Sequence, residues 1–181
     1  LDAPPTGRIT RFLNVNNEVS GLAKVGPIRN HADLVMGVIA SPRTAVHLVT
    51  LLEEMPVQET VDGVAELREA GLPVGGVIVN MNRTPVLTDS EMALAIAHEL
   101  PLAEITDVVS STGLATKAPM IAEALIREGD DHALRVELER REFARLEDLD
   151  VPILRLPFLS GGIDLASLYE LSTDLTDQGV R

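Results

Sequence analysis

The chain has 181 residues, of which 45% are hydrophobic, and its 15 basic and 28 acidic side chains give a formal net charge of −13. A chain of this length can bury a sizeable apolar core. No apolar run approaches the ~20 residues that cross a bilayer, so we do not expect a membrane-spanning protein. Because a protein needs a basic face to neutralise a phosphate backbone, the acidic balance argues against nucleic-acid binding.

The chain contains no cysteine. This absence excludes disulfides, thiol catalysis and thiolate zinc sites, and it fits a cytoplasmic protein. The first residue is Leu1 rather than Met. We therefore expect a processed chain or a piece of a longer polypeptide.

The N-terminal part is predicted to contain a turn followed by helices. Pro4-Pro5 cannot be helical, which indicates a turn over residues 1–8, and apolar residues at helical spacing follow over 9–25. Residues 33–40 are too short for periodicity to separate a strand from a buried helix. We favour a helix because Asn30 can cap it and Ser41-Pro42 can end it.

The central part has the pattern of a βαβ unit. Residues 44–52 (TAVHLVTLL) form a β-branched, nearly continuous apolar run, which is typical of a strand buried on both faces. A helix is predicted over 57–70 with Gly71 at its C-terminal end. Residues 74–79 (VGGVIV) then form a second buried strand that stops at Asn80. The two strands are therefore expected to be parallel.

The remaining segments extend the α/β pattern. Asp89 is expected to cap a short helix. A long charged helical region covers 119–149, and the pattern leaves its continuity across 129–131 open. A third strand over 151–158 and a final helix over 163–177 follow. No internal repeat or linker is visible, so residues 1–181 are predicted to form a single α/β domain or part of one.

Several common catalytic motifs are absent. Neither lysine follows a glycine, so the phosphate-binding loop GxxxxGK[ST] is missing. The sequence also has no GxGxxG after a predicted strand, no HExxH and no GxSxG, and its four histidines are not at metal-ligand spacing. A dehydrogenase is therefore not expected.

The first candidate site is the N-terminal segment DAPPTGR. The Asp2 carboxylate is suited to hold a metal-bound water, and the amide of Gly7 can approach a terminal phosphate closely. The structural alternative is a proline-rich turn with no ligand.

Three more candidates follow predicted strands. Asn80 carries the donor–acceptor pair that recognises an adenine edge, and ligands in open α/β sheets bind beyond the carboxyl ends of the strands. The segment Leu156-Pro157-Phe158 offers an apolar wall for a flat ring, and Glu53-Glu54 can meet a ribose hydroxyl. Each also has a purely structural explanation, as a turn, a strand end or a helix start. The agreement among all four candidates, the N-terminal segment included, is the stronger argument, because all are expected at one edge of the sheet.

These motifs resemble those of a known family. The run DAPPTGR followed by RFL is similar to the switch II segment of arsenical-pump and tail-anchored-protein-targeting ATPases, D-x-A-P-T-G-H-x-x-R-x-L. Four later segments also agree with the family pattern and occur in the same order as in the family. They are TAVHLVTLLEE, PVQET, a strand ending in IVN, and LRLPF. The chain thus resembles the actinobacterial-style branch of the ArsA-type family over nearly its whole length.

The resemblance implies a fold and a partial domain. The fold would be part of a doubly wound, mostly parallel sheet of the P-loop NTPase type, with helices on both faces. Within it, residues 1–13 would form the switch II segment, and residues 44–83 and 151–162 the adenine side. The chain would be the C-terminal part of a larger ATPase domain.

The resemblance also implies roles for individual residues. Asp2 would lie near Mg²⁺, bound through water, and the Gly7 amide would sense the γ-phosphate of ATP. Asn80 would recognise adenine, and Pro157 with its neighbours Leu156 and Phe158 would pack against the base. Glu53 would face the nucleotide near a dimer interface. The implied ligands are ATP and Mg²⁺, and the implied partners are a homo- or heterodimeric ATPase and a protein client that the sequence does not identify.

The chain departs from the family pattern in three ways. The phosphate-binding loop should lie well upstream of Asp2, and in this sequence only Leu1 precedes Asp2. Arg8 replaces the usual histidine after Thr-Gly, and the lack of cysteine removes the arsenite thiols and the zinc clasp. We therefore expect the C-terminal portion of a Mg²⁺-dependent ATPase that couples ATP hydrolysis to dimer rearrangement, inactive by itself. The alternative is a non-catalytic partner or scaffold subunit of such an ATPase.

Overall fold

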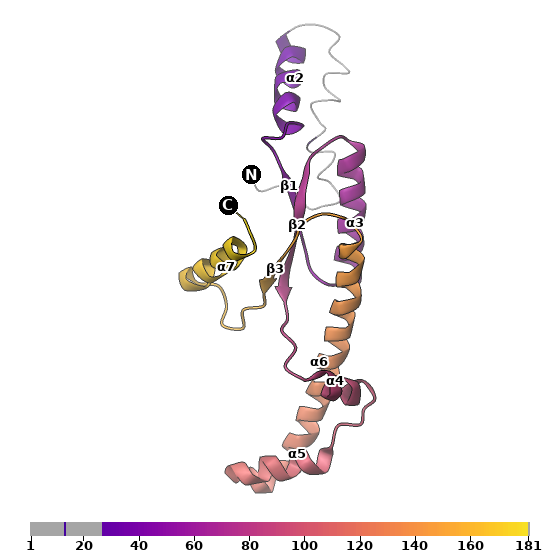
Figure 1. The fold of residues 1–181 in the computed structure, drawn as a ribbon. Helices are drawn as coiled ribbons and strands as arrows, with labels where there is room; N and C mark the ends of the chain where they lie inside the picture. The colour runs from indigo at the N-terminus through magenta and orange to yellow at the C-terminus, as the bar shows by residue number, and fades with distance from the viewer. Residues whose placement is uncertain (1–12, 14–26, 181) are drawn as a thin grey trace. The chain divides into compact units, whose positions relative to one another are not determined.

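The computed structural model describes Leu13 and residues 27–180 (Figure 1). The chain divides into two compact units, which we treat separately. The first unit consists of residues 1–82 and 142–181, and the second unit is Arg83–Arg141. The predicted turn over residues 1–8 lies outside the described residues. So does the predicted helical segment over 9–25, except for Leu13, which is helical.

A three-stranded parallel sheet forms the centre of the first unit (Figure 1). Its strands are β1 (Val46–Thr50), β2 (Val74–Asn82) and β3 (Ile153–Pro157), in the order β1-β2-β3. Both strand pairs are parallel, and the helix α3 (Glu54–Glu69) connects β1 to β2. The predicted α/β class and the parallel βαβ unit are therefore confirmed.

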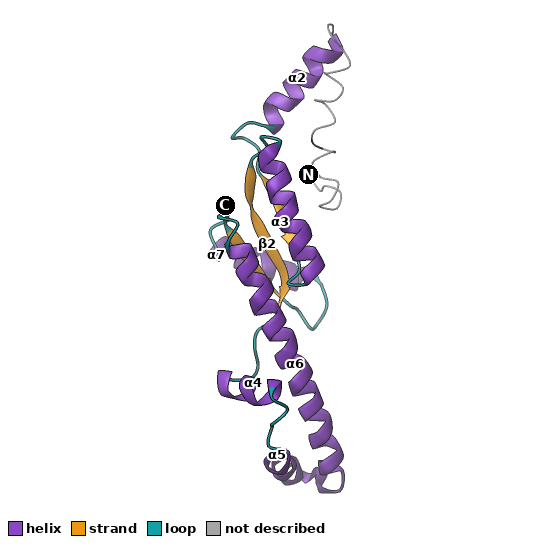
Figure 2. Cartoon of the chain, turned by 90° about the vertical axis from the view of Figure 1, so that its right-hand side faces the viewer, coloured by secondary structure: helices purple, strands orange, loops and turns teal. Residues whose placement is uncertain are grey.

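Helices lie on both sides of this sheet. The helix α3 and the C-terminal end of α6 (Ala118–Glu147) cover one side, whereas α7 (Leu165–Asp177) lies on the other side next to β3 (Figures 1 and 2). The guanidinium of Arg155 in β3 stacks 3.6 Å from the ring centre of Phe143 in α6. The core between the sheet, α3 and α6 is a cluster of buried apolar side chains: Leu48, Leu52, Val57, Val64, Leu67, Leu72, Val77, Val79 and Leu146.

The helix α2 spans Pro27–Ile39 in the described part of the chain. The prediction of a helix rather than a strand over 33–40 is confirmed. The predicted cap is wrong, because Asn30 lies inside the helix. The residues Met36 and Ile39 pack against the core cluster of the first unit, which explains why this short apolar segment is helical.

The C-terminal end of α3 is set by Gly71, as predicted. Gly71 has a φ of 68°, and its N–H donates to the carbonyl of Arg68 at 3.1 Å. The N–H of Leu72 donates to the carbonyl of Leu67 at 2.9 Å. This pair of hydrogen bonds is a Schellman motif, which favours glycine at the left-handed position. Because Leu67 and Leu72 are both buried, the motif also directs the chain into the core.

Two glycines of β2 allow close approach of the neighbouring strands. A Cβ atom on Gly75 would lie 2.6 Å from Cε1 of His47, and one on Gly76 would lie 2.7 Å from the carbonyl oxygen of Pro152. Only glycine fits at such contacts. The register of β1 against β2 also shifts between Val46 and His47.

The strand β1 differs from its prediction in one respect. Leu48 and Thr50 are each 4% exposed, whereas Val49 is 58% exposed and His47 is exposed as well. The expectation that this strand is buried on both faces is therefore wrong for the described residues. The helix α3 packs against one face of the strand, and on the other face His47 and Val49 are exposed among the described residues.

The second unit is helical and has its own small core. It contains α4 (Asp89–Ile96), α5 (Leu102–Val109), two short helical turns (Ser110–Leu114 and Ala115–Lys117) and most of α6. Its core cluster of buried apolar residues consists of Met92, Ala95, Ala133 and Val136, and Val109, Ala118 and Ala122 are buried elsewhere in the unit. The helix α5 had no counterpart in the sequence prediction. None of the described helices has the length and apolar character needed to cross a membrane.

The helix α6 continues through 129–131, which resolves the question that the sequence left open. A Cβ atom on Gly129 would lie 3.0 Å from Cδ1 of Leu100. The glycine thus lets the segment after α4 approach α6 closely. This packing offsets the helix-weakening effect of glycine.

The N-terminus of α4 is capped by Thr88, so the prediction that Asp89 is the cap is wrong. The N–H of Glu91 donates to Oγ1 of Thr88 at 3.3 Å, and the N–H of Thr88 donates to Oε2 of Glu91 at 2.8 Å. This capping box satisfies two backbone donors at once. Hydrogen bonds from the Thr88 side chain and then from its backbone hold the pKa of Glu91 below its usual value.

Ion pairs supplement the small core of the second unit. The buried carboxylate of Glu139 lies 3.2 Å from Nε of Arg135 and 3.6 Å from Nε of Arg83. In addition, Nδ1 of His98 lies 2.6 Å from Oδ2 of Asp130. These contacts join the segments before and after α4 to the helix α6.

Candidate functional site

The carboxyl ends of the three strands meet at one edge of the sheet, because all three are parallel. We call this the carboxyl edge and define it as residues 50–54, 80–82 and 156–162. Asn82 is the register partner of Pro157, and the N–H of Phe158 donates to the carbonyl of Asn82 at 2.9 Å. The structure thus brings together backbone segments that are more than 70 residues apart in sequence.

Asn80 lies inside β2 rather than after it. The prediction that the strand stops at Asn80 is therefore wrong, since β2 continues to Asn82. The register of β2 against β3 shifts between Val79 and Asn82, and the intervening Met81 has a φ of 55°. A positive φ is uncommon for a residue other than glycine and costs stability unless its surroundings hold it. No sequence pattern indicates this bulge.

The side chain of Asn80 supports the bulge and keeps hydrogen-bonding capacity. Its Oδ1 accepts a hydrogen bond from the N–H of Met81 at 2.9 Å. An amide oxygen has a second lone pair and the Nδ2 group has two donors. No described residue hydrogen-bonds to this Nδ2 group. A half-buried amide whose donors are unused by the described residues, and whose acceptor is partly used, is suited to recognise the edge of a base.

The second part of the carboxyl edge is apolar. Leu156 and Pro157 are half-buried, and the ring of Phe158 is 44% exposed directly after β3. Met81 is 45% exposed at the end of the neighbouring strand. Met81 near the end of β2 and Phe158 directly after β3 thus place two exposed apolar side chains at the ends of adjacent strands, so the carboxyl edge offers apolar surface as well as the Asn80 amide.

A capping box marks the end of the segment that follows Phe158. Gly162 has a φ of 81°, and Asp164 is the N-cap of α7. The N–H of Ser167 donates to Oδ1 of Asp164 at 2.8 Å, and the N–H of Asp164 donates to Oγ of Ser167 at 2.7 Å. The backbone of Ser167, and then its hydroxyl, lower the pKa of Asp164. The box sets where α7 begins.

Glu53 occupies the N-cap position of α3, just beyond the end of β1. Its carbonyl accepts the hydrogen bond from the N–H of Val57 at 3.0 Å, but its carboxylate makes no capping hydrogen bond. The side chain is half-buried. Glu53 is therefore placed at the carboxyl edge, as its sequence position predicted.

The structure does not test the N-terminal candidates. Asp2, Gly7 and Arg8 lie outside the described residues. Among the residues that the structure describes, no group of three or more histidine or acidic side chains is arranged to hold a metal ion. A magnesium ligand at Asp2 therefore stays a prediction.

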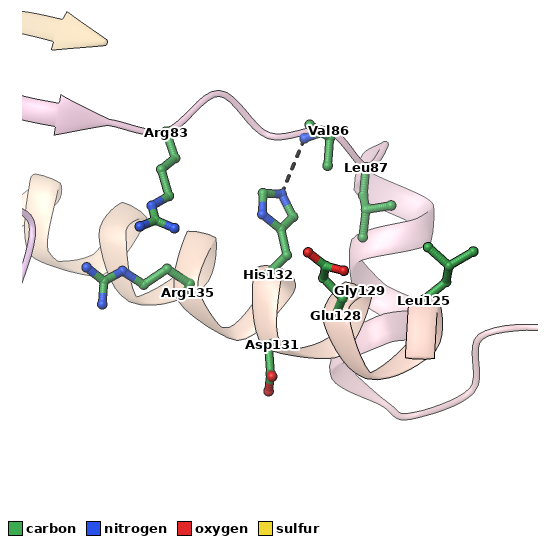
Figure 3. A pocket seen from close by; sticks show the side chains of 9 residues that line it. All are labelled: Arg83, Val86, Leu87, Leu125, Glu128, Gly129, Asp131, His132 and Arg135. Atoms are coloured by element: carbon green, nitrogen blue, oxygen red, sulfur yellow. Dashed lines mark hydrogen bonds between the residues drawn. The ribbon is translucent and has the colours of Figure 1, made fainter. Parts of the chain in front are cut away.

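A pocket of about 470 Å³ lies in the second unit, and none of the predicted site residues lines it. In Figure 3, Arg83 and Arg135 lie next to each other at one end and Leu125 lies at the other. Between them, Nε2 of His132 accepts a hydrogen bond from the N–H of Val86 at 3.3 Å. The buried Glu139 neutralises part of the charge of the two arginines. No sequence motif indicates this pocket.

The fold and the carboxyl edge thus define an α/β chain with polar and apolar groups gathered where ligands bind in open parallel sheets. The chain matches no family model. It is 43% identical over 185 residues to ATPase BagA of Mycobacterium tuberculosis and, equally, to the protein named "Putative ATPase Mb3704" of Mycobacterium bovis. The matches cover 100% of this chain and 53% of each relative, so the chain spans about half the length of the curated relatives it matches. These names support an ATPase-related role.

Proposed function

We propose that this chain forms the adenine-side part of a Mg²⁺-dependent ATPase of the ArsA type. The observation that carries the proposal is the carboxyl edge, where Asn80 lies near the end of β2, Phe158 follows β3, and the Asn82–Phe158 hydrogen bond joins the two strands. The Asn80 amide supplies the polar contacts for a purine edge, and the Phe158 ring supplies an apolar surface. The similarity to proteins named ATPase over the whole chain supports the same conclusion.

In this proposal the chain provides only part of the chemistry. Phosphoryl transfer depends on positioning and on charge stabilisation around Mg²⁺. Asp2 would hold the ion through a water molecule, and the Gly7 amide would contact the terminal phosphate. The loop that cradles the phosphates is absent from this sequence. The chain by itself should therefore not hydrolyse ATP, and hydrolysis that Asp2→Ala abolishes would contradict this part of the proposal.

The proposed ATPase works as a homo- or heterodimer in the cytoplasm, with Glu53 near the dimer interface. Its sheet would be doubly wound, with β1, β2 and β3 as part of it.

The second unit would handle the protein client, because it exposes several large apolar side chains on α5, α6 and the turns between them. These are Leu102, Val108, Leu114, Met120, Leu125 and Leu134. The same surface favours the alternative, a non-catalytic partner subunit, in which the carboxyl edge would bind no nucleotide.

Nucleotide titration followed by NMR tests the proposal on the 181-residue chain. Addition of ATP with Mg²⁺ should shift the amide resonances of residues 80–82 and 158–162, with weak affinity because the phosphates have no cradle. Asn80→Ala should remove most of these shifts. Asn30→Ala, which changes the same residue type on an exposed turn of α2, serves as the matched control and should leave them intact. No shift at millimolar ATP, or shifts confined to other regions, would favour the partner subunit.

A further inference from the structure

The pocket of the second unit lies between the segment 83–87 and the helix α6 (Figure 3). Its volume of about 470 Å³ is in the range of small-ligand sites. All of its lining residues belong to the second unit. The pocket shares no residue with the carboxyl edge, so a ligand bound here would be separate from the nucleotide of the proposed function.

One end of the pocket is cationic. Nε of Arg135 and Nε of Arg83 lie 3.2 Å and 3.6 Å from the same oxygen, Oε1 of Glu139. The Glu139 side chain is buried, whereas the side chains of both arginines stay partly exposed. Two guanidinium groups thus share one carboxylate behind them. Because arginine pairs with carboxylates through two parallel N–H···O bonds, a second carboxylate in the pocket would suit both arginines.

His132 adds an oriented donor beside the arginines. Its Nε2 accepts the hydrogen bond from the N–H of Val86 at 3.3 Å. A neutral imidazole accepts at one ring nitrogen and carries its hydrogen on the other, so Nδ1 of His132 is a donor. In Figure 3 this second nitrogen lies on the side of the ring that faces Arg83 and Arg135. The imidazole and the two guanidinium groups therefore favour an anion at this end.

The other end of the pocket is apolar. Leu125 is 47% exposed and Val86 is 80% exposed, and Leu87 is half-buried beside them. In Figure 3 the Glu128 carboxylate lies between His132 and Leu87, and the Asp131 carboxylate points away from the segment 83–87. The charge of Glu128 repels an anion from the apolar end. A ligand with one charged and one apolar part would therefore bind in a single orientation.

We infer that this pocket binds a small organic carboxylate with a short apolar chain. The ligand carboxylate pairs with Arg83 and Arg135, and its chain packs against Leu87 and Leu125. An anion without the chain leaves the apolar surface in water. An uncharged chain gives the two arginines no partner. Both parts of the ligand are therefore needed for binding.

Hexanoate is the probe for this ligand class. Titration of the 181-residue chain with hexanoate, followed by amide NMR, should give saturable shifts at residues 83–88 and 125–135. We expect a dissociation constant of roughly 0.1–1 mM. Acetate lacks the chain and hexan-1-ol lacks the charge, so each should bind about tenfold more weakly or worse. Absence of saturable shifts with hexanoate, or equal binding of acetate or hexan-1-ol, would overturn the inference.

Two variants with matched controls test the two ends of the pocket. Arg135→Gln should weaken hexanoate binding by about tenfold, whereas Arg127→Gln, at an exposed arginine of the same helix outside the pocket, should not. Leu125→Ser tests the apolar end without touching the ion pairs of Glu139, and it should weaken binding by about fivefold. Its control is Leu134→Ser, at a leucine that is 51% exposed outside the pocket. Unchanged affinity in Leu125→Ser would overturn the inference even if Arg135→Gln fails to fold.

A peptide terminus is the competing source of a carboxylate beside an apolar group. An acetylated tripeptide that ends in leucine should bind more weakly than hexanoate, because its backbone amides would lose water at the apolar end. Tighter binding of the peptide than of hexanoate would overturn the assignment of a small free carboxylate. The ATP-dependent shifts at residues 80–82 and 158–162 are a separate measurement. Their absence would contradict the proposed function and leave the carboxylate pocket standing.

Discussion

The two units of this chain are stabilised in different ways. The first unit packs a parallel sheet, α3 and the end of α6 around nine buried apolar side chains. The second unit buries a cluster of four, Met92, Ala95, Ala133 and Val136, and adds ion pairs around Glu139 and Asp130. Apolar burial is the larger source of stability, and exposed ion pairs contribute little. We therefore expect the sheet of the first unit to be rigid and to position the carboxyl edge. We expect the helical second unit to unfold locally more readily.

The largest effect is expected in the core of the first unit. Leu67 is fully buried in α3, and Leu67→Ala should lower the free energy of unfolding by about 2–5 kcal/mol because it leaves a cavity. Chemical denaturation followed by circular dichroism measures this change. Leu134→Ala, at a leucine that is 51% exposed in the second unit, should change stability by well under half as much. Equal losses of unfolding free energy for Leu67→Ala and Leu134→Ala would contradict the view that apolar burial in the first unit is the larger source of stability.

An intermediate effect is expected at the ion pairs of the second unit. Glu139→Gln removes the buried carboxylate that Arg83 and Arg135 share. We expect a loss of about 1–2 kcal/mol, below the usual cost of breaking a buried pair because both arginines can still reach water. Hydrogen exchange should accelerate in α4 and α6 and stay unchanged in the sheet. Glu137→Gln, at an exposed residue of the same helix, provides the control. Faster exchange in the sheet would show that the units unfold together.

The smallest effect is expected at the helix caps, which occur in both units. Thr88→Ala removes the capping box of α4 and should cost about 1 kcal/mol. Ser167→Ala removes the corresponding box of α7 in the first unit. Thermal denaturation of both variants compares the two caps. A larger loss of thermal stability for Ser167→Ala than for Thr88→Ala would indicate that the first unit depends more on this helix cap than on its apolar core.

The same caps predict a dependence on pH. The folded state lowers the pKa of Glu91 and of Asp164. Each carboxylate therefore contributes stability at pH values above its unfolded pKa, and this contribution disappears as the pH falls through the folded pKa. An NMR titration should show the pKa of Glu91 returning towards its usual value in Thr88→Ala and staying low in Ser167→Ala. An unchanged Glu91 titration in Thr88→Ala would contradict this assignment.

Much of the secondary structure follows from local sequence patterns. The runs 44–52 and 151–158 contain β1 and β3, the run 74–79 covers β2 up to Asn80, and Gly71 ends α3 as predicted. Their β-branched composition and glycine geometry act within a few residues, so a single segment contains the information. The helix α5 was missed, and its sequence has no strong start signal because its N-cap residue is Pro101 and makes no side-chain capping bond.

The candidate site was predictable only in part. Asn80, Glu53 and Phe158 were expected at one edge from the rule that parallel strands share their carboxyl ends, and the structure places them there. Their binding roles stay predictions, as do those of Asp2 and Gly7. The bulge at Met81 was not predictable, because its positive φ depends on the Asn80 side chain and on the pairing of Asn82 with β3.

The sequence by itself determined the α/β class, the parallel strands and the net negative charge, because composition and short-range periodicity are properties of each segment. The tertiary structure decided what depends on distant contacts. It extended β2 to Asn82, kept α6 continuous across Gly129 and hydrogen-bonded the Gln178 side chain to the backbone of Arg155 in β3. It also corrected the prediction that β1 is buried on both faces. The periodicity indicated burial on both faces, and only the packed chain showed that His47 and Val49 are exposed on one of them.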